Sequence, residues 1–129
     1  MGRAQNKRSA QRKITERIEI SRLTSLDDLV VIARTGYLVD ASATGFLIHI
    51  SRQDLVPRKL RENLNLEPLI GEHIMVHLPQ MNLEIEGRIT RARHIGRGVF
   101  AVAIDFSDES PEYWRECLIE LLPAPGEMD

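Results

Sequence analysis

The stretch LEIEGRIT, residues 83–90, alternates apolar or small residues with polar ones at every step. A period of two is typical of a β-strand that has one buried face and one wet face. The segments HIMVHL (73–78) and VFAVAIDF (99–106) have apolar residues at the same spacing, and the short segments PQMN (79–82) and IGRG (95–98) separate the three. Consecutive strands joined by short turns predict an antiparallel sheet.

The rest of the chain completes this sheet. Residues 54–62 read as a short helix with Pro57 in its first turn, and residues 63–70 as an irregular connection. N-cap candidates and a proline precede a helical apolar pattern over about residues 110–121. Further strands are expected at residues 18–20, 29–33, 37–40 and 46–50. We therefore expect an all-β dominated fold: a small six-stranded antiparallel β-barrel with a C-terminal helix and a short helical insertion.

The charge distribution divides the chain into parts. Among residues 1–17 there are six basic residues and one acid, although the formal net charge of all 129 residues is -2. We expect a flexible basic arm over residues 1–13, one barrel domain over 14–122, and a tail over 123–129. A basic arm either contacts an anionic partner or is a solvated leader, and composition does not choose between the two.

Several functional classes are disfavoured by the composition. The single cysteine, Cys117, excludes an intramolecular disulfide and fits a cytoplasmic protein. No apolar run approaches the roughly 20 residues of a membrane helix, so membrane insertion is not expected. His73 and His77 would lie about 13 Å apart along a strand, too far to share a metal ion. Ser42 has no local histidine base, so a hydrolase is not expected. With Cys117 on the apolar face of the expected last helix and Glu84 and Glu86 on a wet strand face, the candidate residues together argue against an enzyme.

The segment DASATG, residues 40–45, carries the most specific chemistry. The carboxylate of Asp40 can accept two parallel N–H bonds, which matches the N1–H and N2–H2 edge of guanine. Ser42 can donate to a phosphate or to a purine acceptor, and Gly45 allows a tight turn or a close approach of the backbone to the ligand. The arginines upstream of this segment can bind phosphate or the O6/N7 edge of guanine through two parallel hydrogen bonds. The alternative reading is an Asx-turn that leads into a strand.

The segment DASATG resembles the [D/N]-x-S-x-x-G motif of PilZ domains, and RKITER (residues 12–17) resembles the R-x-x-x-R motif that precedes it in that family. The resemblance covers roughly residues 8–122. It implies a six-stranded barrel that binds the bacterial second messenger cyclic di-GMP, with no cofactor. The ligand-binding residues that we expect on this basis are Arg8, Arg12, Lys13, Arg17, Asp40, Ser42 and Gly45.

The sequence departs from the PilZ pattern at one position. Aligned on Arg17, the first arginine of the motif falls on Lys13, which keeps the charge but loses the planar fork. Arg12 can substitute, and Arg8 with Arg12 forms a second R-x-x-x-R register further from the barrel. In this family a basic residue immediately before the motif is associated with two stacked ligands, so the place of Arg12 suggests two cyclic di-GMP molecules per site.

The sequence leaves two alternatives to a cyclic di-GMP receptor. The departure at Lys13 is compatible with a degenerate PilZ adaptor that binds no nucleotide and acts through a protein partner. Whether the chain is a cyclic di-GMP receptor or an adaptor, we expect an unidentified protein partner that responds to the module. Nucleic-acid binding through the basic arm is disfavoured, because the body is acidic and only 5% of the residues are aromatic.

Overall fold

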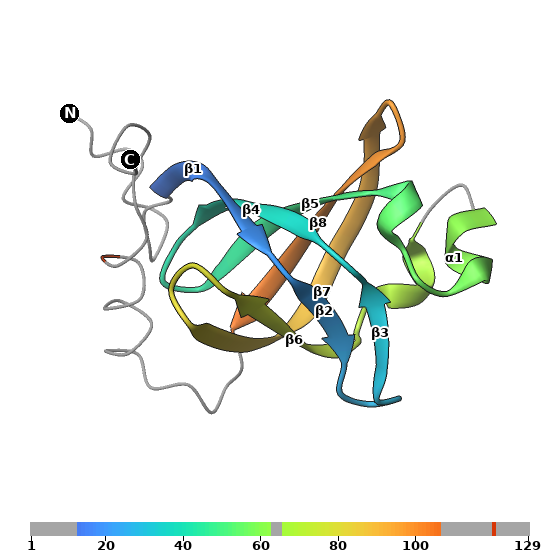
Figure 1. Ribbon diagram of the computed structural model, residues 1–129, viewed down its shortest axis with the longest axis horizontal. Coiled ribbons are helices and arrows are strands. Elements are labelled where there is room, and N and C mark those ends of the chain that lie inside the picture. Colours follow the sequence, from blue (N-terminus) through green and yellow to red (C-terminus); the bar gives the residue numbers. More distant parts are fainter. Residues whose placement is uncertain (1–12, 63–65, 107–119, 121–129) are drawn as a thin grey trace.

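The computed structural model describes residues 13–62, 66–106 and 120, with only the backbone for residues 13–16. Eight strands form one antiparallel sheet, which curls round on itself (Figure 1). The strands are β1 Lys13–Ile20, β2 Arg22–Ser25, β3 Val30–Ala33, β4 Gly36–Ala41, β5 Gly45–Ser51, β6 His73–Leu78, β7 Leu83–Gly96 and β8 Val99–Phe106.

The sheet closes because its first long strand is bent. Its order is β1-β4-β5-β8-β7-β6-β2-β3, and only Ser21 separates β1 from β2 along the chain. At the bend, the amide of Ser21 donates to the carbonyl of His77 at 2.9 Å. One chain segment therefore pairs with β4 by its first half and with β6 by its second half. Counted as one strand, β1–β2 closes a six-stranded barrel with β4, β5, β8, β7 and β6, and β3 is attached at the edge of β2.

The apolar residues of the alternating strands fill the interior of the barrel. In β6 and β8 every second residue is buried, including Ile74, Val76, Phe100 and Val102 at 0% exposure. Removing such side chains from water supplies the main stabilisation, roughly 1.5–3 kcal/mol for each fully buried residue. The alternation leaves a polar row on the outside of β6 and β7, as the sequence pattern predicts.

The segment between β5 and β6 covers one end of the barrel. It contains the helix α1 Arg58–Glu62 and two 3-10 turns, η2 Arg52–Asp54 and η3 Glu67–Leu69. Its leucines enter the core, since Leu55 and Leu66 are fully buried. Residues 54–56 also pair with the outer edge of β3, through Arg34 N–H to Asp54 O (2.9 Å) and Val56 N–H to Ile32 O (2.8 Å). The insertion therefore plugs the barrel and shields part of an edge strand.

The structure confirms the expected all-β class, the antiparallel barrel and the short helical insertion. It corrects several local expectations. β1 begins at Lys13 rather than near Ile18, so Arg17 lies inside a strand. Leu29 was expected in a strand but lies before β3, at φ 57° and 80% exposed. β2 was not expected, because RLTS is short and becomes a strand through its pairing with β6.

The expected closing helix at 110–121, the tail at 123–129 and most of the arm at 1–13 lie outside the described residues, apart from Lys13 and Glu120. Within the described part of the chain, no helix has the length and apolar character needed to cross a membrane.

Candidate functional site

Two irregularities in the sheet reshape the outer face near Asp40. On the β5 side of β4, Leu38 pairs with Ile48 and Asp40 pairs with Leu47, so β4 carries one extra residue. On the β1 side, Ile14 pairs with Asp40 and Ile18 with Leu38, so β1 carries two extra residues. Such bulges re-aim side chains and are frequent beside functional sites. Tyr37 and Asp40 are three residues apart, a spacing that places two side chains on opposite faces of a regular strand. The extra residue in β4 brings both to the same face.

Tyr37, Arg17 and Asp40 converge with His49 on this outer face. The guanidinium carbon of Arg17 lies 4.7 Å from the centre of the Tyr37 ring, a cation–π arrangement. Tyr37 pairs directly with His49 across β4 and β5. Burial lowers the pKa of His49 below its ordinary value of 6.5; the positive charge of Arg17 lowers it further and the carboxylate of Asp40 raises it. An arginine and a carboxylate from separate strands thus act on one imidazole.

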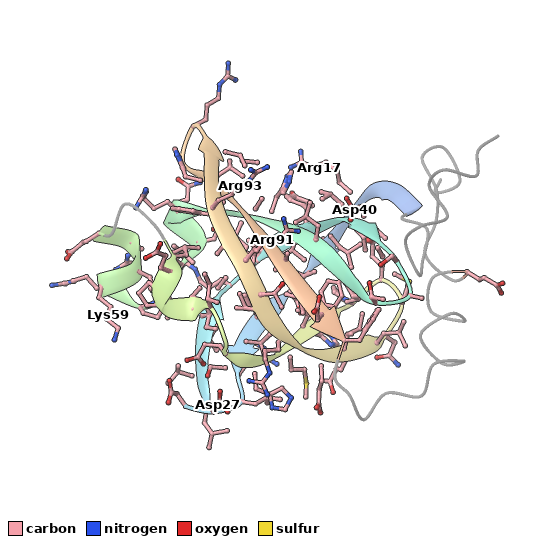
Figure 2. The ribbon with its side chains drawn as sticks, turned by 180° about the vertical axis from the view of Figure 1, so that it is seen from behind. Arg17, Asp27, Asp40, Lys59, Arg91 and Arg93 are labelled. Atoms are coloured by element: carbon pink, nitrogen blue, oxygen red, sulfur yellow. The ribbon has the colours of Figure 1, made fainter. Side chains whose placement is uncertain are left out.

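Two further arginines lie across the same face (Figure 2). The register aligns Asp40 with Leu47, Ala103 and Arg91, and it aligns Tyr37 with His49, Ala101 and Arg93. Three strand spacings separate Asp40 from Arg91, about 14 Å at roughly 4.8 Å each. Both arginines are exposed, and in Figure 2 they lie on the same side of the barrel as Arg17 and Asp40.

Small and apolar side chains lie between the two groups of charged side chains. β5 presents Leu47 there, and β8 presents Ala101 and Ala103. We define the outer basic face as Arg17, Tyr37, Asp40, His49, Arg91 and Arg93, with these two alanines as its floor. The sequence interpretation missed Arg91 and Arg93. Their signal was their two-residue spacing at the end of a long strand, which places both on one face.

Ser42 is used inside the β4–β5 turn. It is 3% exposed, its Oγ lies 3.0 Å from Thr44 Oγ1, and it accepts a hydrogen bond from the Thr44 amide at 3.2 Å. The Ser42 amide donates to the carbonyl of Gly45 at 2.8 Å. These bonds order the turn that follows Asp40. In this structure the Ser42 hydroxyl therefore stabilises the turn, and it affects the position of Asp40 only indirectly.

Gly45 is required by close packing between strands. A Cβ at this position would lie 2.2 Å from the carbonyl oxygen of Ile104 on β8. Gly87 on β7 is similar, because its Cβ would lie 2.4 Å from the carbonyl oxygen of Asp105. Gly45 is not among the residues with positive φ. The sequence suggested a tight turn or an approach to the ligand as the reason for this glycine, and the structure shows a different one, the close approach to the backbone of β8.

The remaining predicted site residues are only partly described. Arg8 and Arg12 lie outside the described residues. Lys13 is described by its backbone alone, which pairs with Ala41 at the start of β1. Of the seven residues expected to bind ligand, the structure therefore brings together Arg17 and Asp40 on one face, with Ser42 and Gly45 buried beside them.

Two histidines on β6, outside this face, lie near glutamates of β7. His73 Nε2 lies 3.5 Å from Glu86 and His77 Nδ1 lies 3.8 Å from Glu84. Among the residues that the structure describes, no three histidine, cysteine, aspartate or glutamate side chains are grouped to hold a metal ion.

Comparison with known proteins identifies the fold. No protein-family model and no curated protein sequence matches the chain. A solved structure does: the PilZ domain of YcgR from Escherichia coli, determined with cyclic di-GMP, is similar with a TM-score of 0.54 and 18% identity. The match covers 89% of this chain and 90% of that one. This chain therefore has the fold of a PilZ domain, and the fold expected from the sequence resemblance is confirmed.

Proposed function

We propose that this protein is a cyclic di-GMP-binding module, and that the outer basic face is its ligand site. The observation that carries the proposal is the convergence of Arg17 and Asp40 beside His49, which two bulged strands produce. The likeness to a PilZ domain determined with this ligand supports it. The module acts by binding, with no catalytic group of its own and no cofactor.

The chemistry of the face suits a guanine dinucleotide. The Asp40 carboxylate accepts from the N1–H and N2–H2 donors of one guanine, a donor pair that adenine lacks. Arg17 contributes a planar guanidinium that contacts phosphate or stacks on a purine. Its position over Tyr37 reduces the conformational freedom that binding would otherwise remove. Arg91 and Arg93 contact the second half of the ligand, across the alanine floor.

The basic arm closes the site in this proposal. Arg12 comes immediately before β1 in the sequence, and Lys13 is the first residue of β1. This strand lies next to β4, which carries Asp40. Binding orders Arg8 and Arg12 and positions the Lys13 side chain over the ligand, and the altered arm changes the surface that a protein partner contacts. With Arg12 immediately before the motif, we propose two stacked ligands per site. In this proposal the module works in the cytoplasm, which fits a chain with a single cysteine.

Isothermal titration calorimetry with cyclic di-GMP tests the proposal directly. We expect saturable binding, two ligands per chain, and little binding of cyclic di-AMP. Asp40→Ala and Arg17→Ala should each weaken binding by about tenfold or more, since each removes a charge-assisted contact. Arg22→Ala is the matched control, because Arg22 is exposed on β2 and pairs with His77, away from this face. Unchanged affinity in both site variants would contradict the proposed site.

A second candidate is an adaptor that binds no nucleotide. Lys13 in place of arginine favours it, and so do exposed apolar side chains at another part of the surface, Leu29, Val30 and Ile70 at 80%, 47% and 47% exposure. A thermal shift assay separates the two functions. A receptor is stabilised by cyclic di-GMP through mass action, whereas an adaptor keeps its melting temperature.

A further inference from the structure

A second basic site lies near the insertion, apart from the outer basic face. A pocket of about 350 Å³ is lined by Ser51, Arg52, Gln53, Arg61, Arg97 and Gly98. Three chain segments supply its arginines: η2, the helix α1 and the turn between β7 and β8. Residues far apart in sequence therefore bring three arginines to the lining of one pocket. We call it the arginine pocket.

Arg52 is held in a defined position at the wall of this pocket. Its backbone amide donates to the carbonyl of Gly98 at 2.7 Å, and its Nη1 donates to the carbonyl of Arg61 at 3.0 Å. Its guanidinium carbon lies 5.0 Å from the centre of the Phe100 ring. A guanidinium held by such contacts loses less conformational entropy when it binds an anion.

The turn that presents Arg97 adopts an uncommon conformation. Gly96, Arg97 and Gly98 have φ of 111°, 56° and 74° in succession. This left-handed region is less favourable for arginine than for glycine, because of the arginine Cβ. The Gly98 amide donates to His94 Nε2 at 3.1 Å, and the His94 ring packs on Phe100 with centres 5.3 Å apart. Phe100 therefore supports both the turn and Arg52.

The charges of the residues that line the pocket favour an anion. Arginine is the only charged residue type among its lining residues, and Ser51 and Gln53 add a hydroxyl and an amide. The pocket lies beyond the end of the outer basic face, because Ser51 follows His49 by two residues along β5, about 7 Å, and follows Leu47 by four, about 13 Å. Its volume lies at the low end of the range for small-molecule sites, roughly 300–1,000 Å³.

We propose that the arginine pocket binds a small phosphate monoester, such as a phosphorylated sugar. The planar forks of the arginines match the oxygens of a terminal phosphate, and Ser51 and Gln53 bond the hydroxyl groups of the attached sugar. This site does not depend on the outer basic face. It gives the module a second anionic ligand, bound at the opposite end of β5 from the Asp40 turn.

Titration of the full chain with ribose 5-phosphate at low ionic strength tests this proposal, followed by calorimetry and by amide chemical shifts. We expect one saturable site, with shifts at Ser51, Arg97 and Gly98, and competition by inorganic phosphate but not by ribose. Arg61→Ala should weaken binding about tenfold. Arg97→Gly should do the same while relieving the left-handed strain, so this variant keeps the fold.

The controls separate the pocket from other sources of anion binding. Arg22→Ala removes an exposed arginine elsewhere and should leave the affinity for ribose 5-phosphate unchanged. Asp40→Ala alters the outer basic face and should also leave it unchanged, whatever happens to cyclic di-GMP binding. The proposal is overturned if ribose 5-phosphate shows no saturable binding. Equal losses in Arg22→Ala and Arg97→Gly would overturn it too, because they would indicate general charge attraction.

Discussion

Replacement of Gly45 by alanine separates two roles of the glycine in the D-x-S-x-x-G motif. The new Cβ would lie 2.2 Å from the Ile104 carbonyl oxygen and 3.1 Å from the Asp105 Cα, whereas ordinary contacts begin at 3.4 Å. Both neighbours are backbone atoms of β8, which cannot rotate away as a side chain can. β5 and β8 must therefore move apart by about 1 Å at the Gly45–Asp105 pair.

The cost of this movement follows from the contacts it disturbs. Overpacking typically costs about 1–3 kcal/mol, and a weakened backbone hydrogen bond adds about 1 kcal/mol. The bond from the Phe106 amide to the Thr44 carbonyl, 2.9 Å long, lies beside the pair and is exposed to the same displacement. We expect Gly45→Ala to lower the free energy of unfolding by about 2–4 kcal/mol, which is roughly 10 °C in melting temperature.

Urea denaturation followed by circular dichroism measures this loss, and calorimetry with cyclic di-GMP well below the melting temperature measures binding. Gly71→Ala is the comparison, because Gly71 has φ 96° but open space around it, so only backbone strain of about 1 kcal/mol is expected. A Gly45→Ala protein with wild-type stability would refute the close-packing explanation. If that protein also lost ligand binding, the glycine would serve the ligand directly.

Three further predictions concern the site. Ser42→Ala should lower the free energy of unfolding by about 1 kcal/mol, because it leaves the Thr44 amide without its acceptor; urea denaturation measures it. Arg91→Ala and Arg93→Ala should each weaken cyclic di-GMP binding by about tenfold in calorimetry. The lowered pKa of His49 means that the unfolded chain binds this proton more readily than the folded one. Stability should therefore fall as the pH drops below about 6.5, and His49→Gln should reduce that fall in urea titrations across this range.

A specific result would contradict each of these three predictions. Wild-type stability in Ser42→Ala would show that the turn does not depend on the hydroxyl. Unchanged affinity in Arg91→Ala and Arg93→Ala, alongside a loss in Arg17→Ala, would confine the site to the β1–β4 side. Equal acid sensitivity in wild-type protein and His49→Gln would show that His49 does not contribute. Ligand phosphates near His49 should raise its pKa, so proton uptake on binding is a further check by calorimetry in buffers of different ionisation enthalpy.

Much of the fold was predictable because alternation reports burial directly. Ile85 and Ile89 are buried and Glu84 and Glu86 exposed, as the pattern of residues 83–90 requires. The exceptions are places where pairing partners decide the structure. RLTS becomes β2 because β6 lies beside it, and Leu29 leaves the strand pattern at a left-handed position that no local pattern indicates.

The candidate site was predictable only in part. The DASATG motif and Arg17 were recognised from residue types and spacing. Strict alternation from Tyr37, however, would place Asp40 on the opposite face of β4, and only the bulge between Leu38 and Asp40 places them together. Arg91 and Arg93 join the site through three successive strand pairings, which involve segments distant in sequence.

The strand periodicity and the short turns follow from the sequence alone, since both depend on neighbours along the chain, and so do the residue types at the Asp40 corner. Packing of the folded chain sets which strands meet, how the bend at Ser21 closes the barrel and which arginines share a face with Asp40. Bulges and interstrand register depend on contacts between segments far apart in sequence. A shift of one residue in register moves a side chain to the other face of the sheet, so these choices are made only when the strands pack together.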